Sequence, residues 1–226
     1  MADQLSKTGS SDIAVFLNKV ADSPIPVKAG DGRLIFAMDA TMSRQASWDQ
    51  AIGIQSQMFL EAKKIGGLAV QLVFFRGLNE CRASKWVSDP EALARLMSRV
   101  TVQGGNTQIG KVLAHVKSEF SKTRVNAVVY VGDAMEENID SLCAQAGELG
   151  LLGTPLFMFQ EGQDPKASLG YKELARLTRG AYFKLDGNSP GVLAELLRAV
   201  AAYVAGGRKA LNGKGGMAKL LLEQMS

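Results

Sequence analysis

The feature that most constrains the fold of this 226-residue chain is a regular alternation of short apolar runs with amphipathic segments. The runs at 33–39, 68–76 and 125–133 consist mainly of aliphatic and aromatic residues, which is typical of strands buried on both faces of a sheet. Strands are predicted at 33–39, 68–76, 80–87, 125–133, 154–160 and 180–186, with 80–87 as a weaker edge strand.

Between these runs the apolar residues recur with helical spacing, as in Ile109, Val112, Leu113 and Val116. Helices are predicted at 47–65, 89–100, 109–120, 138–150, 168–178 and 190–204. Strand–helix alternation predicts an α/β fold, a three-layer, doubly wound, Rossmann-like and mostly parallel sheet of about six strands with helices on both faces. Ligands of such sheets bind beyond the carboxyl ends of the strands, so functional residues are expected just after those ends.

Three regions are predicted along the chain. Residues 30–205 hold the wound sheet, and residues 1–29 hold a short amphipathic helix at 11–21 followed by a linker rich in proline and glycine. Residues 206–226 begin with five glycines in eleven residues, a linker composition, and end in a short helix from Met217. Either terminal helix would dock on the domain, engage a partner or self-associate.

Composition excludes several function classes. The net charge of +4 comes from scattered residues, which argues against a nucleic-acid-binding protein. No uncharged apolar run approaches the ~20 residues that a membrane span needs, and the N-terminus lacks the apolar core of a signal peptide. Cys81 and Cys143 lie far apart in the sequence and neither belongs to a motif with a partner cysteine, which is typical of reduced thiols in a cytosolic protein. We therefore expect a cytoplasmic protein without membrane contact.

Oxygen-bearing side chains lie where three of the predicted elements meet loops. Asp39, Thr41 and Ser43, in "DATMS", leave the end of the first strand. Thr107 lies where a loop enters a helix, and Asp133 ends the run "VVYVGD". Carboxylates and hydroxyls are hard ligands that select Mg²⁺, Mn²⁺ or Ca²⁺ over zinc or copper. These five residues are the predicted metal ligands, with Mg²⁺ as the expected ion.

The segments "DATMS", "GGNTQIG" and "VGD" together resemble the metal-ion-dependent adhesion site of von Willebrand factor type A domains, and the resemblance covers roughly residues 30–205. That family's pattern is D-x-S-x-S, a distant threonine after glycines, and an aspartate ending the fourth strand. Thr41 departs from it by replacing a serine, and Asn106 departs by separating the glycines from Thr107. The segment "LARLTRGAYFKLD" also resembles the family's usual run into its last strand.

The resemblance implies a protein-binding module in which a partner's Asp or Glu carboxylate completes the metal shell. It also implies, from cytosolic bacterial relatives, a role in assembly or ATPase-linked complexes. Physical chemistry supports the first point, because neutral hydroxyl ligands leave a dication under-neutralised and attractive to an external anion. Glu136 and Glu137, just beyond Asp133, are interpreted as rim charges. No enzyme activity is expected, because no general base besides the aspartates accompanies "DATMS".

Two alternatives stay open. Gly105 to Lys111 nearly matches a nucleotide-binding phosphate loop after a possible strand at 99–103, but Val112 stands where that motif needs a Ser or Thr. His115, the only histidine, is interpreted as a solvated helix residue rather than a catalytic one. The second alternative is a scaffold with a vestigial metal site that acts through its terminal helices.

Overall fold

The computed structural model describes residues 31–41, 49, 51, 60, 67–185 and 190–225. Its strands are β1 (Gly32–Asp39), β2 (Leu68–Arg76), β3 (Glu80–Ala83), β4 (Ala127–Gly132), β5 (Leu156–Gln160) and β6 (Ala181–Lys184). Its helices are α3 (Pro90–Met97), α4 (Ile109–Lys122), α5 (Ile139–Leu151), α6 (Pro165–Leu177), α7 (Pro190–Gly206), the 3₁₀ helix η2 (Arg208–Leu211) and α8 (Met217–Gln224).

The strands form one six-stranded sheet in the order β3-β2-β1-β4-β5-β6, and only β3 runs antiparallel to its neighbour. The chain moves outward from β1 to β3 and then returns to pair β4 with the other side of β1. The strand order therefore reverses between β1 and β4, which is where doubly wound sheets bind ligands. The predicted fold class is confirmed.

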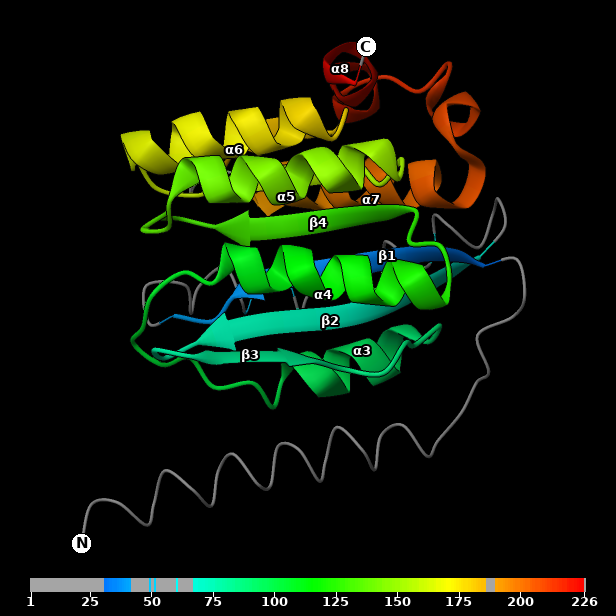
Figure 1. The fold of residues 1–226 in the computed structure, drawn as a ribbon. Coiled ribbons are helices and arrows are strands. Elements are labelled where there is room, and N and C mark those ends of the chain that lie inside the picture. The colour runs from blue at the N-terminus through cyan, green and yellow to red at the C-terminus, as the bar shows by residue number, and fades with distance from the viewer. Residues whose placement is uncertain are drawn as a thin grey trace, which may run out of the picture.

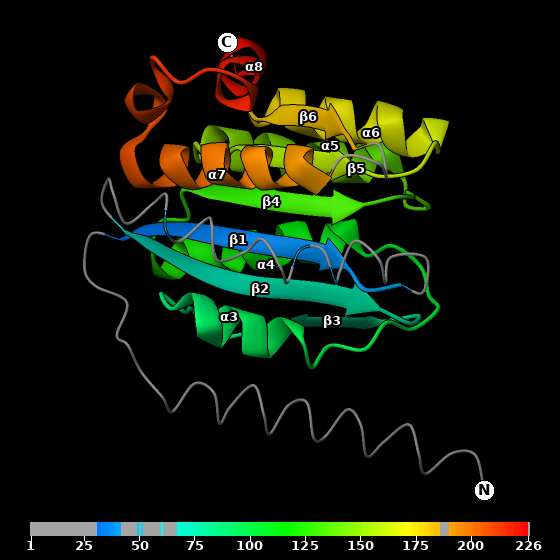
Figure 2. The ribbon, with the colours of Figure 1, turned by 180° about the vertical axis from the view of Figure 1, so that it is seen from behind.

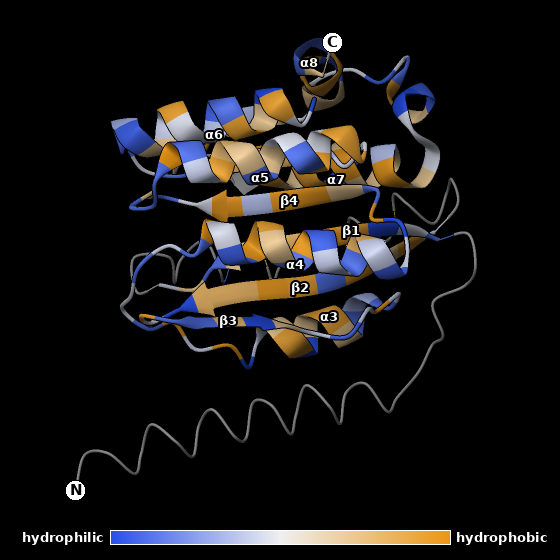
Figure 3. Cartoon of the chain, viewed as in Figure 1, coloured by the Kyte–Doolittle hydropathy of each residue, from blue (hydrophilic) through white to orange (hydrophobic). Residues whose placement is uncertain are grey.

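Helices cover both faces of the sheet. α4, α5 and α6 lie on one face, and α3 and α7 lie on the other (Figures 1 and 2). Each face has its own core, one around Ile35, Phe75 and Tyr130 and the other around Phe36, Phe74 and Phe157. β2 and β4 are mainly hydrophobic, the edge strand β3 is hydrophilic, and the helices mix hydrophobic with hydrophilic residues (Figure 3). None of the helices in the described segments combines the length and apolarity needed to cross a bilayer.

The C-terminal helix α8 docks on the domain, which is one of the three arrangements that its sequence left open. Ala218, Leu221 and Met225 are buried in the same core as α7. The amide of Gln224, which ends the apolar stripe, accepts a hydrogen bond from the backbone N–H of Tyr182 on β6 at 2.8 Å. α8 thus satisfies part of the outer edge of β6.

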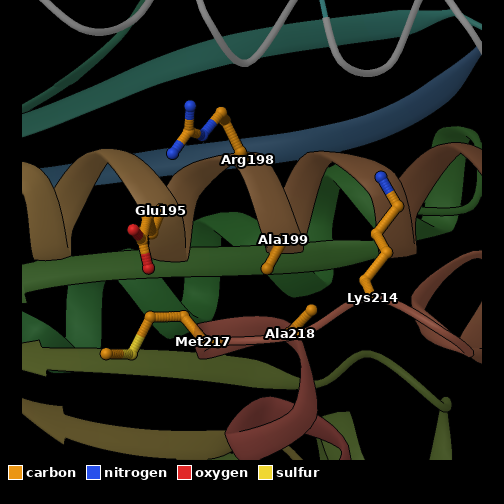
Figure 4. A pocket seen from close by; sticks show the side chains of 8 residues that line it. Glu195, Arg198, Ala199, Lys214, Met217 and Ala218 are labelled. Carbon is orange, nitrogen blue, oxygen red and sulfur yellow. The ribbon is translucent and has the colours of Figure 1, made fainter.

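A surface pocket of about 370 Å³ lies between α7 and the segment that leads into α8 (Figure 4). Glu195, Arg198 and Ala199 line it from α7, and residues 214–218 line it from the other side. It shares no residue with the carboxyl edge of the sheet, where the predicted ligands lie.

Several boundaries differ from the prediction. β3 ends at Ala83 rather than at 87, because the Ser84 hydroxyl accepts the hydrogen bond of Leu72 N at 3.0 Å. Val87 then pairs with Val70 only as an isolated bridge.

α6 begins at Pro165, three residues earlier than predicted, because Asp164 caps it through the N–H of Lys166. The predicted helices at 11–21 and 47–65 lie outside the described residues, except for residues 49, 51 and 60 of the second.

His115 is not the solvated residue that its place on the helix suggested. Its Nε2 lies 2.8 Å from the amide oxygen of Gln71, a buried residue of β2, and the imidazole is half-buried. Burial lowers the pKa of His115, and the nearby charge of Glu119 opposes that shift. The interpretation failed because its polar partner comes from the sheet beneath the helix, 44 residues away in sequence.

Candidate metal centre

The end of β1 supplies the first part of the candidate site. Asp39 is the last residue of β1 and is 1% exposed. Its Oδ1 accepts a hydrogen bond from the backbone N–H of Thr41 at 2.8 Å, which turns the chain sharply at the edge of the sheet. Thr41 is also buried, so both side chains belong to the floor of this edge. Ser43, the third predicted ligand here, lies outside the described residues.

The neighbouring strand β4 brings the second carboxylate alongside. Met38 of β1 pairs with Val131 of β4, so the two strands end almost level. Asp133 follows β4 directly and is partly buried. Asp39 and Asp133 therefore stand at adjacent strand ends, at the point where the strand order reverses.

The loop before α4 is held at the ends of β1 and β2 and supplies Thr107. It is tied to the sheet by two backbone hydrogen bonds, from Gln103 N to Ala40 O at 3.0 Å and from Asn106 N to Gly77 O at 3.1 Å. A Cβ on Gly105 would lie 2.1 Å from Gly77 O, whereas a Cβ on Gly104 would meet nothing within 4 Å. Of the glycine pair, only Gly105 is required by this close approach.

These segments enclose one pocket of about 240 Å³. Four of the five predicted ligands line it, namely Asp39, Thr41, Thr107 and Asp133, together with Gly104, Gly105, Ala134 and Glu136. Oxygen donors separated by up to 94 positions in the sequence thus converge on one small space. The geometry brings the predicted residues together wherever the structure describes them.

Two glutamates of the β4–α5 loop, interpreted from the sequence as rim charges rather than ligands, contact the loop before α4 and the first turn of that helix. Glu136 lines the pocket, and its Oε2 accepts hydrogen bonds from Thr107 N at 2.9 Å and from Thr107 Oγ1 at 2.5 Å. Glu137 accepts from Ile109 N at 2.7 Å and from Gly110 N at 2.8 Å. It thereby caps α4, whose own N-cap residue Gln108 makes no side-chain capping bond.

No local spacing could have identified these roles, because each glutamate reaches residues 27 to 29 positions away. The favourable interaction of a carboxylate with a helix N-terminus gives a physical reason for Glu137. The sequence held little signal of this role, because Asn106 and Thr107 precede the helix as possible capping residues and only the structure shows that the N-cap Gln108 makes no capping bond.

The donor set of the pocket fits a hard divalent cation. Asp39 and Asp133 offer carboxylate oxygens, and Thr41 and Thr107 offer hydroxyl oxygens. A water molecule takes about 30 Å³ of liquid volume, so the pocket has room for an ion with several waters. Within the described segments no group of three or more His, Cys, Asp or Glu side chains is placed to hold a metal. The softer, nitrogen- and sulfur-rich type of site is therefore not seen there.

Comparison with protein-family models and with curated proteins gives no match. Solved structures do match. The SpRpn10 VWA domain superposes with a TM-score of 0.56 at 12% identity, over 74% of this chain and 94% of that one. The chain has a von Willebrand factor type A (vWA) fold.

Two further structures with this fold carry metal. Manganese-loaded TRAP protein of Plasmodium vivax matches with a TM-score of 0.55 at 13% identity, over 75% of this chain and 74% of that one. Proximal thread matrix protein 1 of the mussel byssus has zinc in its metal-ion-dependent adhesion site (MIDAS). It matches with a TM-score of 0.58 at 16% identity, over 76% of this chain and 46% of that one. At these identities the likeness concerns the vWA fold.

Proposed function

We propose that this vWA-fold protein is a metal-dependent protein-binding module. Asp39, Thr41, Thr107 and Asp133 would hold Mg²⁺, or Mn²⁺ or Ca²⁺ in its place, with Ser43 as the fifth ligand. The observation that carries the proposal is that these four oxygen-bearing side chains, from three separate segments, line a single pocket at the switch point of the sheet. Metal in the vWA-fold structures of TRAP and of the byssus protein supports it.

The residues have distinct roles in this proposal. Asp39 and Asp133 would supply the negative charge that balances a dication, and Thr41 and Thr107 would supply neutral oxygens. With Ser43 the set has five ligands, one fewer than octahedral Mg²⁺ needs. A bound ion supplies an open coordination position for an anionic oxygen. The pocket opens at the sheet edge, so an Asp or Glu on the surface of a partner protein can enter that position.

Catalysis finds little support at this pocket, and we propose that the protein is not an enzyme. Neither cysteine lines it, and His115 faces Gln71 of β2 instead. The nucleotide-binding alternative lacks its structural context, because residues 101–108 form no strand before α4. Val112, at the position where a phosphate loop needs a hydroxyl, is buried in the core.

Calorimetric titration with Mg²⁺ and Mn²⁺ tests the metal site. Wild type is expected to bind one ion, and Asp39→Asn to weaken binding by at least about tenfold, since it removes one charge next to a dication. Asp140→Asn, an exposed carboxylate of α5, is the matched control and should bind as wild type does. If wild type binds neither ion, the scaffold with a vestigial site becomes the better account.

Partner capture tests the second half of the proposal. Immobilised wild type, incubated with lysate in Mn²⁺, is expected to retain partners that EDTA releases and that Asp39→Asn fails to retain. A partner retained equally in EDTA and by Asp39→Asn would place binding elsewhere, for example on a terminal helix. Binding of ATP that is lost in Lys111→Ala would instead support the nucleotide alternative.

A further inference from the structure

Thr107 and Glu136 form a reciprocal pair at the wall of the candidate metal pocket. Thr107 donates to Glu136 Oε2 from its backbone N–H at 2.9 Å and from its hydroxyl at 2.5 Å. The Thr107 hydroxyl oxygen in turn accepts from the backbone N–H of Glu136 at 3.2 Å. Three hydrogen bonds thus join one residue of the α4 loop to one residue of the β4–α5 loop.

This pairing fixes the direction of the Thr107 hydroxyl. A hydroxyl has one proton and two lone pairs. Its proton is directed to the Glu136 carboxylate, and one lone pair faces the Glu136 N–H, so a single lone pair remains. A hydroxyl can ligate a cation only through a lone pair, and a proton pointing into the pocket would repel the ion. Glu136 therefore leaves Thr107 in the state that a metal ligand requires.

We infer that Glu136 is a positioning residue of the metal centre and acts through Thr107. The inference rests on the proposed function and deepens it by adding a residue outside the ligand pattern. Glu136 is exposed and is not grouped with Asp39 and Asp133 as a metal-holding cluster among the described residues. Its contribution is to orient a neutral ligand rather than to donate an oxygen to the ion.

A simpler explanation is that any carboxylate near the pocket attracts a dication through space. Glu137 separates the two explanations, because it belongs to the same loop and carries the same charge but contacts Ile109 N and Gly110 N instead of Thr107. A through-space charge effect would appear in both glutamates. It would also persist when the Thr107 hydroxyl is removed, whereas an effect that acts through that hydroxyl would vanish.

A double-mutant cycle measured with Mn²⁺ alone tests the inference. The variants are Glu136→Ala, Thr107→Ala and the double variant, each checked by urea unfolding without metal so that misfolded protein is not scored. Glu136→Ala removes both bonds to Oε2, and loss of the one that the Thr107 hydroxyl makes to this charged group corresponds to about a tenfold weakening of Mn²⁺ binding. The double variant is expected to bind as Thr107→Ala does, within about twofold.

Two conservative variants complete the design. Glu136→Gln keeps an amide oxygen that can accept from Thr107, so it should stay within about threefold of wild type. Glu137→Gln should also stay within about threefold. Effects of Glu136→Ala and Thr107→Ala that multiply in the double variant would overturn the inference, as would unchanged affinity in Glu136→Ala. If wild type binds no Mn²⁺, the proposed function falls, and the inference falls with it.

Discussion

Glu119 is a buried carboxylate near the C-terminal end of α4, whereas the candidate metal centre lies at the N-terminal end. It joins segments that are distant in the sequence. Its carboxylate lies 3.2 Å from the guanidinium of Arg33 on β1. It also accepts hydrogen bonds from Trp86 Nε1 at 2.7 Å and from Lys122 Nζ at 2.6 Å. The Arg33 guanidinium also stacks on the Trp86 ring at 3.9 Å. Burial alone would raise the pKa of Glu119, but the hydrogen bonds of Lys122 and Trp86 outweigh burial and leave the pKa below its ordinary value.

This lowered pKa links Glu119 to the pH dependence of stability. A carboxyl whose pKa is depressed in the folded state stabilises the protein above its unfolded pKa, and the stabilisation is lost as pH falls through the folded value. Glu119→Gln is expected to lower the free energy of unfolding at pH 7 by about 2–3 kcal/mol, because Arg33 and Lys122 lose their charged partner. Urea unfolding should show the difference from wild type shrinking below about pH 4.5.

A matched control for this prediction is Glu148→Gln. Glu148 pairs with Lys117, but both side chains are more than half exposed. Exposed pairs contribute little, so its loss should cost less than about 1 kcal/mol. A difference between wild type and Glu119→Gln that is as large at pH 3 as at pH 7 would show that the carboxylate charge is not the source of the effect.

At the scale of elements, the loop before α4 depends on one of its two glycines. A side chain at Gly105 would collide with the backbone of Gly77, whereas Gly104 faces open space. Gly105→Ala is expected to displace the loop that carries Thr107 and to weaken Mn²⁺ binding by about tenfold or more, given how strictly ligand placement is constrained. Gly104→Ala should leave the affinity within about threefold. Equal affinities of the two variants in calorimetry would contradict this reading.

Helix α8 offers a second paired comparison. Leu221 is fully buried against the core, and its neighbour Leu220 is 43% exposed. Leu221→Ala is expected to lower the free energy of unfolding by about 2–4 kcal/mol, and Leu220→Ala by less than about 1 kcal/mol. Urea unfolding of the full chain measures both. Similar small effects would mean that α8 is not part of the cooperative unit in solution.

The sequence predicted the elements that local patterns encode. The strand at 68–76 was predicted residue for residue, because a strand buried on both faces is a nearly continuous apolar run, which only Gln71 interrupts before Arg76 ends it. Asp39 and Asp133 were placed correctly at strand ends for the same reason. Contacts that join residues distant in sequence were not predictable, as with Glu137 and the start of α4 or His115 and Gln71. The packing of the fold determines these contacts, and the periodicity of the sequence does not indicate them.

For the whole molecule, the order in which the strands are laid down creates the candidate site. The return of the chain to β4 sets Asp133 at the strand end next to Asp39, and the loop before α4 brings Thr107 into the same pocket. Bringing carboxylates together at one edge costs electrostatic energy that a bound cation would offset. Under the proposed function, the chain therefore trades stability without metal against affinity for metal.

This trade predicts that the order of stability of wild type and Asp39→Asn reverses when Mn²⁺ is added. In EDTA, Asp39→Asn is expected to be at least as stable as wild type, because it removes one of the converging charges and keeps an oxygen that can accept from Thr41 N. With free Mn²⁺ at a hundred times the dissociation constant, wild type should gain about 2.7 kcal/mol, and the variant should gain much less. Urea unfolding in EDTA and in Mn²⁺ measures both differences. If Mn²⁺ stabilises wild type less than it stabilises the variant, Asp39 does not face the ion. If adding Mn²⁺ instead makes wild type more stable than Asp39→Asn, the carboxyl edge of the sheet binds the cation.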